Sequence, residues 1–217
     1  MVFSYLNQHI MTTTSHKPNL ALFDFDGTIT EREMFSVFLR FSAPTYRKWL
    51  GNLIVIPCYL LYQRGLFSPV KLRKLTAFLG LAGRRFSDVD KMGCRFSHDV
   101  IPQYLRENAL AQIRMHQQKG DVVVVVSASL DVYLSHWCKQ HDLLLLCNQV
   151  KVKHGFVTGT FKQADCSNQE KVNKVKQRLD LSDFDTIYAY GDTEEDLAML
   201  AIADEKYMNW QKISNDD

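Results

Sequence analysis

Acidic residues follow two apolar runs of the 217-residue chain at the point where each run ends. Asp24 and Asp26 close the run 19–25, just before Gly27-Thr28, and the cluster Gly191-Asp192-Thr193-Glu194-Glu195-Asp196 follows the run 186–190. Carboxylates this close repel one another and raise a pKa unless a cation lies between them. Mg²⁺ prefers hard oxygen ligands of this kind. If both runs are parallel strands of one sheet, the clusters meet at its carboxyl edge and predict a magnesium site.

Each acidic cluster alone has a simpler interpretation. Asp and Gly after a strand suit a tight turn, and an acidic stretch before a helix suits the positive end of the helix dipole. Two acidic strand ends in one parallel sheet are harder to explain by local geometry, so the pair favours the metal site.

Two further positions could handle a phosphate group. Ser127 ends a run of five valines and precedes Ala128, Ser129 and a predicted helix; a hydroxyl and free N–H groups at a helix start can bind an anion. A plain N-cap is the alternative. Lys171, near the start of a basic helix, could offset the charge of an aspartate and a phosphate. Lys174 in the same helix is a rival for this role.

The pattern around these residues alternates strands with helices. The valines 122–126 indicate a strand buried on both faces, Gly120 is a suitable helix end, and 149–161 alternates around His154-Gly155 as in a hairpin. A last short strand is expected in 205–210. This alternation predicts an α/β fold with a Rossmann-like, mostly parallel sheet and right-handed crossovers.

The stretch 31–106 has helical periodicity and no comparable strand run. We therefore expect a Rossmann-like catalytic core from residues 18–30 and 107–217 and a helical cap from residues 31–106, inserted after the first strand. Such an insertion would lie over the carboxyl edge of the sheet, where ligands bind in this architecture.

Trp49–Tyr62 is the most apolar stretch of the predicted cap. It is interrupted by Pro57 and is shorter than the ~20 residues that cross a bilayer. We expect it to be buried as the core of the cap. Peripheral membrane contact through an exposed apolar patch is the alternative.

Composition narrows the class of protein. The net charge of +2, with 46% hydrophobic residues, indicates a soluble globular protein and argues against a nucleic-acid partner. The odd, scattered cysteines, without a C-x-x-C pair, favour a reducing cytoplasmic setting. No signal peptide is expected, and Met11 is an alternative start. One basic cluster is interpreted as a solvated helix face, with steering of an anionic substrate as the alternative; its members are Lys71, Arg73, Lys74, Arg84 and Arg85.

The acidic and phosphate-handling positions together resemble a known family. Asp24-Phe25-Asp26-Gly27-Thr28, Ser127, Lys171 and Gly191-Asp192…Asp196 are similar, in this order, to the four motifs of the haloacid dehalogenase-like hydrolase superfamily. The position of the insertion resembles the phosphoserine-phosphatase-like branch, subfamily IB, which has a helical cap.

The resemblance implies a role for each motif residue. Asp24 would be the nucleophile that forms an aspartyl-phosphate, and Asp26 the general acid and base, which dehalogenases lack. Lys171 would neutralise the phosphate, and Glu33 matches a substrate-binding position. Phosphate would be held by Thr28, Ser127 and Ala128. Mg²⁺ would be held by Asp24, Asp26 through its backbone carbonyl, Asp192 and Asp196, the last ordering its shell.

Departures from the family pattern bear on the substrate. Ala128-Ser129 stands where phosphoserine phosphatases have Gly-Gly, and Glu195 stands where they have Asn. These changes leave the reaction untouched but argue against phosphoserine itself. We predict a Mg²⁺-dependent phosphatase acting on a small soluble phosphate ester. The alternatives are a lipid-phosphate phosphatase of the phosphatidylglycerophosphate type, a phosphomutase, and a non-catalytic binding protein on the same fold; the oligomeric state stays open.

Overall fold

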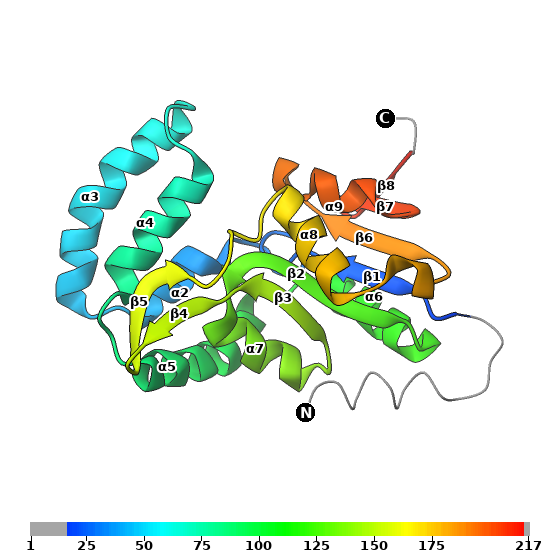
Figure 1. Cartoon of the computed structure of the whole chain (residues 1–217), viewed down its shortest axis with the longest axis horizontal. Helices are drawn as coiled ribbons and strands as arrows, with labels where there is room; N and C mark the ends of the chain where they lie inside the picture. Colours follow the sequence, from blue (N-terminus) through cyan, green and yellow to red (C-terminus); the bar gives the residue numbers. More distant parts are fainter. Residues whose placement is uncertain (1–16, 215–217) are drawn as a thin grey trace.

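The computed structural model describes residues 17–214, and the alternative start at Met11 lies outside this range. A six-stranded sheet with strand order β3-β2-β1-β6-β7-β8 forms its centre (Figure 1). All neighbouring strands are parallel except β7 and β8. The strands are β1 (Leu20–Phe23), β2 (Val122–Leu130), β3 (Leu144–Asn148), β6 (Ile187–Gly191), β7 (Glu205–Met208) and β8 (Gln211–Ile213). The predicted mostly parallel α/β sheet is confirmed.

Alternation along the central strand divides the apolar core between the two faces of the sheet. Ala21 and Phe23 belong to a cluster with α6 (Glu107–Lys119) and α7 (Asp131–Gln140). Leu20 and Leu22 belong to a second cluster with α8 (Gln169–Arg178) and α9 (Leu197–Ala201). Because successive side chains of a strand point to opposite faces, an all-apolar β1 is covered by helices on both sides.

The predicted insertion after β1 is confirmed as helical. It contains α2 (Met34–Ser42), α3 (Thr45–Gln63), α4 (Pro69–Leu81), α5 (Phe86–Asp99) and the short 3-10 helix η1 (Ile101–Tyr104). Backbone hydrogen bonds join its two ends, from Glu31 N to Tyr104 O (2.8 Å) and from Arg106 N to Ile29 O (2.9 Å). The insertion therefore leaves the core and returns to it at one point.

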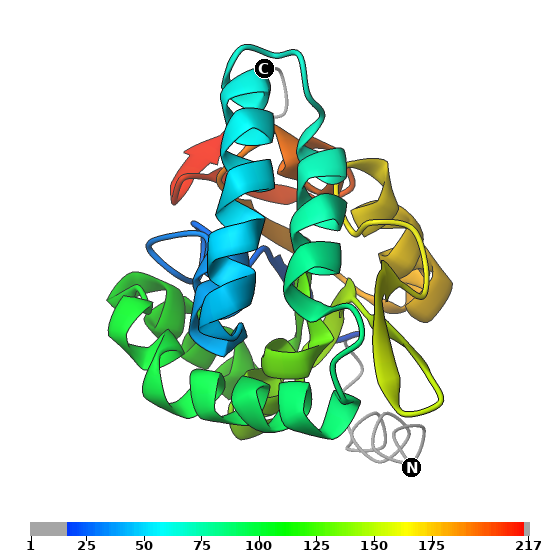
Figure 2. The same ribbon diagram turned by 90° about the vertical axis from the view of Figure 1, so that its left-hand side faces the viewer.

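The helices of the insertion differ in their surroundings. Phe38 of α2 and Phe96 of α5 pack against Tyr133 of α7, inside the same apolar cluster as β1. The helices α3 and α4 instead form a hairpin that extends along the outside of the molecule (Figure 2). We call residues 45–81 the α3–α4 arm. The predicted division at residues 31–106 stays a prediction, since α2 and α5 share the core.

A β-hairpin supports the arm. It consists of β4 (Val150–Lys153) and β5 (Phe156–Phe161), joined through His154 and Gly155, which both have positive φ, so the hairpin expected at these residues is present. In β5, Gly159 has φ +82°, and a Cβ there would lie 2.9 Å from the Cα of Phe78. The absence of a side chain lets β5 approach α4 closely.

The expectation that Trp49–Tyr62 is buried is wrong. The segment lies in α3, whose buried residue is Gly51, while Trp49 is 78% exposed and Leu53 is 76% exposed. A helix with apolar residues on several sides needs neighbours on several sides, whereas α3 packs against α4 (Figure 2). None of the described helices is long and apolar enough to cross a bilayer.

Smaller differences lie at the ends of elements. The strand expected to end at Ser127 continues to Leu130 with an irregular register. After β6, a 3-10 turn, η3 (Glu194–Asp196), precedes α9. The last predicted strand is β7, and β8 was not predicted because its three residues are mostly polar.

Two helical glycines allow a matched test of the contact between insertion and core. A Cβ on Gly93 of α5 would lie 1.7 Å from Val132 O of α7, whereas a Cβ on Gly51 of α3 would meet nothing within 4 Å. Gly93→Ala should therefore lower the free energy of unfolding by about 1–3 kcal/mol through overpacking, and Gly51→Ala should raise it by about 0.5–1 kcal/mol through helix propensity. Urea unfolding of both variants checks this, and a stabilised Gly93→Ala would contradict the packing.

Candidate active site

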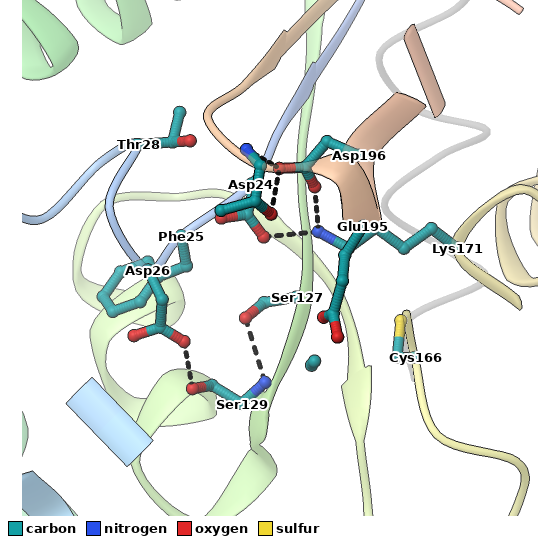
Figure 3. Close-up of polar contacts among 12 residues, drawn as sticks. Asp24, Phe25, Asp26, Thr28, Ser127, Ser129, Cys166, Lys171, Glu195 and Asp196 are labelled. Atoms are coloured by element: carbon teal, nitrogen blue, oxygen red, sulfur yellow. Dashed lines mark hydrogen bonds and ion pairs between the residues drawn. The ribbon is translucent and has the colours of Figure 1, made fainter. Parts of the chain in front are cut away.

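The carboxyl ends of three adjacent strands bring the predicted site residues together. Asp24 follows β1, Ser127 lies in β2, and Asp192 follows β6, at the same edge of the sheet (Figure 3 shows the first two). The backbone N–H of Asp24 continues the pairing with β6 by donating to Tyr190 O at 2.9 Å. Carboxylate oxygens of Asp24, Asp192 and Asp196 all lie within 4.8 Å of one another.

Lys171 is the counter-ion of this acidic cluster. Its side chain is 2% exposed, and its Nζ donates hydrogen bonds to Asp24 Oδ1 and, at 2.6 Å, to Asp196 Oδ1 (Figure 3). Burial alone would lower the pKa of Lys171, but the two carboxylates outweigh it and raise the pKa above the ordinary value. Lys174, the rival, instead donates to the Cys147 carbonyl at 2.9 Å.

Asp26 faces a different environment from Asp24. Its Oδ1 accepts from Met34 N, at the start of α2, at 2.6 Å, and its Oδ2 accepts from the Ser129 hydroxyl (Figure 3). Burial, followed by the charge of Glu33, raises the pKa of Asp26 to about 7, although both hydrogen bonds oppose the rise. A carboxyl group with a pKa near neutrality can both give and take a proton.

The loop after β1 is shaped by a glycine that lies against the acidic cluster. Gly27 has φ +84°, and a Cβ there would lie 2.1 Å from Asp192 Oδ2, so only glycine fits. Thr28 Oγ1 donates to Asp192 Oδ1 at 3.2 Å, and Arg106 Nε donates to Gly27 O at 3.1 Å. The first contact connects the loops after β1 and β6, and the second connects the loop after β1 to the end of the insertion.

Asp196 organises the loop after β6. Its Oδ2 accepts from the backbone N–H groups of Asp192 and Thr193, both at 3.1 Å, while its Oδ1 accepts from Lys171. A Cβ on Gly191 would lie 2.5 Å from the Cβ of Asp196. Burial raises the pKa of Asp192, and the neighbouring charge of Asp196 adds to the rise. The negative charge of this loop is only partly compensated by Lys171.

The predicted phosphate-binding residues lie on or beside this edge, and their roles stay predictions. Ser127 Oγ accepts from Ser129 N at 3.0 Å, and Ala128 O accepts from Asn148 Nδ2 at 2.6 Å. Glu33 caps α2, its carboxylate accepting from Ser36 N at 3.1 Å, and remains exposed.

Ser129 and Asn148 were not predicted as site residues. Their contacts with Asp26 and Ala128 depend on how neighbouring strands are placed. Ser129 lies two residues after Ser127, so strand alternation could have placed it on the same side.

Arg73 of the α3–α4 arm also reaches this edge. Its guanidinium contacts Asp165 at 2.6 Å and Glu195 at 2.9 Å, and its side chain is largely buried. The interpretation of this arginine as part of a solvated helix face is therefore wrong. Its partners lie 92 and 122 residues away, so no local spacing could have identified it.

Comparisons with known proteins span the part of the chain that contains this site. The family model of haloacid dehalogenase-like hydrolases matches residues 21–201. The Protein CicA of Caulobacter vibrioides is 31% identical over 198 residues, covering 88% of this chain and 86% of its own length.

Two solved structures are similar in fold. A protein of unknown function from Bordetella pertussis Tohama I has a TM-score of 0.73 at 21% identity, covering 88% of this chain and 90% of its own. A phosphoserine phosphatase, solved as a phospho-aspartyl intermediate analogue, has a TM-score of 0.64 at 20% identity, covering 88% and 86%.

The two buried lysines of α8 provide a test of the charge pairing. Lys171→Met should lower the free energy of unfolding, measured in EDTA, by about 3–5 kcal/mol, because it leaves buried carboxylates without a counter-ion. Lys174→Met should cost only about 1–3 kcal/mol, because it leaves one carbonyl without a donor. Excess Mg²⁺ should reduce the loss in Lys171→Met but not in Lys174→Met. Equal losses of unfolding free energy in the two variants would contradict the role of Lys171 as the counter-ion of the acidic cluster.

Proposed function

The chain belongs to the haloacid dehalogenase-like hydrolase family, and on this basis we propose that it is a Mg²⁺-dependent phosphatase acting on a phosphate monoester. The proposal rests above all on the different surroundings of two carboxyl groups. Asp24 contacts the Lys171 ammonium inside the acidic cluster, whereas Asp26 is turned toward Ser129 and the start of α2. One carboxylate is thus supported as a nucleophile and the other as an acid.

In the first displacement, a carboxylate oxygen of Asp24 attacks the phosphorus atom. The bond between phosphorus and the ester oxygen breaks, and Asp26 gives its proton to the departing oxygen. The alcohol leaves, and the phosphoryl group remains on Asp24 as an acyl phosphate. A covalent intermediate of this kind divides one difficult step into two easier ones.

In the second displacement, water attacks the phosphorus atom of the aspartyl-phosphate. Asp26, now a carboxylate, takes a proton from that water, the bond from phosphorus to Asp24 breaks, and inorganic phosphate leaves. The pKa of about 7 at Asp26 suits both directions of proton transfer at neutral pH. The Lys171 ammonium offsets negative charge on the nucleophile and on the transferred group throughout.

The charge balance of the cluster fits a divalent cation. Three carboxylates and one ammonium leave two uncompensated negative charges in a largely buried space, and their hard oxygen donors suit Mg²⁺. Asp24, Asp192 and the backbone carbonyl of Asp26 would hold the ion, with Asp196 ordering its shell. When bound, it would lower the repulsion between the Asp24 carboxylate and the phosphate dianion.

Two observations bear on the ester group of the substrate. Glu33 lies close enough to Asp26 to raise its pKa, so a carboxylate flanks the site and favours an amine-bearing metabolite. The exposed apolar surface of α3 favours a lipid phosphate as the second candidate. The expected burial of this segment was one reason for preferring a soluble ester, and that reason no longer holds. A phosphomutase would use the same carboxylates and would be recognised by transfer to a second sugar instead of to water.

Substitution of the two carboxyl groups tests the mechanism. Asp24→Asn should abolish turnover of p-nitrophenyl phosphate, because the amide cannot act as the nucleophile. Asp26→Asn should lower kcat on an ester with a poor leaving group by ~10²–10⁴-fold, the usual contribution of a general acid. EDTA should remove activity reversibly, and the exposed Asp99→Asn should serve as an unaffected control. Full activity of Asp24→Asn with an unchanged fold would refute the mechanism.

A panel of esters with Mg²⁺ tests the substrate class, using phosphoserine, histidinol phosphate and phosphatidylglycerophosphate. If an amine is recognised, Glu33→Gln should raise KM for the amine-bearing substrates several-fold and leave KM for p-nitrophenyl phosphate unchanged. An equal rise in KM for p-nitrophenyl phosphate would indicate only that the substitution disturbs the N-terminus of α2, which Glu33 caps. Preference for the lipid phosphate, independent of Glu33, would favour the second candidate.

A further inference from the structure

The outer face of the α3–α4 arm has an apolar stripe that no other described element covers. Its residues follow one another at spacings of three and four, so they lie along one side of α3. All of them are exposed, and Figure 2 shows α3 along the outside of the molecule. The stripe consists of Tyr46, Trp49, Leu53, Ile56 and Leu60. Exposed apolar surface of this extent marks an interaction site.

The charge of the middle part of the insertion is one-sided. Residues 34–87 contain nine Lys and Arg and no Asp or Glu, which gives this segment a charge of +9. Because the net charge of the whole chain is +2, the remaining residues have a net charge of −7. Among the described residues, Arg73 is the basic side chain of this segment that pairs with carboxylates. The exposed basic residues of the arm are Lys48, Arg64, Lys71 and Lys74. A surface that complements the arm must therefore be anionic as well as apolar.

Aromatic residues occur near both ends of α3. Tyr46 and Trp49 lie in its first turns, and Tyr59 and Tyr62 lie in its last turns, all exposed. Rings with one apolar and one polar part are favoured at the boundary between lipid and water. No described helix can cross a bilayer, so α3 would lie in the plane of the interface.

We propose that the α3–α4 arm docks on the surface of an anionic lipid bilayer. The apolar stripe of α3 enters the boundary between head groups and acyl chains, and the unpaired basic side chains contact anionic head groups. Pairing with a second copy of the chain fits less well, because a symmetric interface would bring two carboxylate-free basic segments together. The docking goes beyond the proposed reaction and would hold for a soluble or a lipid substrate.

The arm is also connected to the candidate active site. α3 packs on α4, and Arg73 of α4 contacts Asp165 and Glu195 at the catalytic edge of the sheet. Docking of the arm would therefore fix the orientation of the site relative to the bilayer.

Flotation of the full chain with vesicles tests this proposal. We expect binding to phosphatidylcholine vesicles that contain about one third phosphatidylglycerol, weak binding to pure phosphatidylcholine, and loss of binding as salt rises. Trp49→Ser/Leu53→Ser should abolish binding, whereas the matched control Val152→Ser, on an exposed valine of β4, should not. Absence of binding by the native chain to the anionic vesicles would overturn the proposal.

A second pair of variants separates the electrostatic contribution. In the arm, the triple variant Lys48→Glu/Lys71→Glu/Lys74→Glu should lower the partition coefficient between water and anionic vesicles by at least about 100-fold. The control changes the net charge equally but lies outside the arm, and it should lower this coefficient far less; it is Lys139→Glu/Lys151→Glu/Lys176→Glu. Hydrolysis of a soluble ester, measured in parallel, should be the same in all variants.

Two further outcomes would contradict docking of the arm on lipid. Equal losses in the two triple variants would mean that binding follows net charge and not the arm. A native dimer that Trp49→Ser/Leu53→Ser dissociates, detected by light scattering without lipid, would show that the stripe joins two copies. Either result would overturn docking on lipid without affecting the proposed phosphatase activity.

Discussion

The carboxyl edge of the sheet depends on the ion pairs that the buried ammonium of Lys171 forms with Asp24 and Asp196. Carboxylates gathered in a largely buried space repel one another, and a low-dielectric interior makes an unpaired charge costly. Lys171 contacts two of the three, and the close approach of the loops after β1 and β6 is possible because Gly27 has no side chain. The same pairing that stabilises this edge also holds the proposed nucleophile, Asp24, beside a positive charge.

Much of this arrangement follows from strand ends and could be predicted. Asp24 and Asp192 were placed correctly at one sheet edge because parallel neighbouring strands end together. The choice of Lys171 over Lys174 depends on the orientation of α8, and the partners of Arg73 depend on tertiary contacts, so neither follows from local pattern. The burial of Trp49–Tyr62 was predicted wrongly because an apolar composition says nothing about which neighbours are present.

The helical insertion combines two physical roles in one segment. Its base, α2 and α5, is part of the main apolar core and supplies the Met34 N–H that binds Asp26. Its arm, α3 and α4, contributes little to that core and carries most of the uncompensated positive charge. Negative charge collects at the carboxyl edge of the sheet and positive charge on the arm, and the ion pairs of Arg73 with Asp165 and Glu195 join the two regions.

The strand order has a consequence for how the chain acquires its structure. β1 is made first but lies between β2 and β6, so it cannot pair with β2 until the whole insertion has been synthesised, or with β6 until most of the core has been synthesised. Lys171 follows Asp24 by 147 residues, and Asp192 follows Thr28 by 164. Contacts between residues so distant along the chain slow folding, because the chain loses the entropy of loop closure before these contacts stabilise it. On the ribosome, the insertion emerges long before the acidic cluster can assemble, so the nascent chain is expected to gain helices early and to complete the candidate active site last.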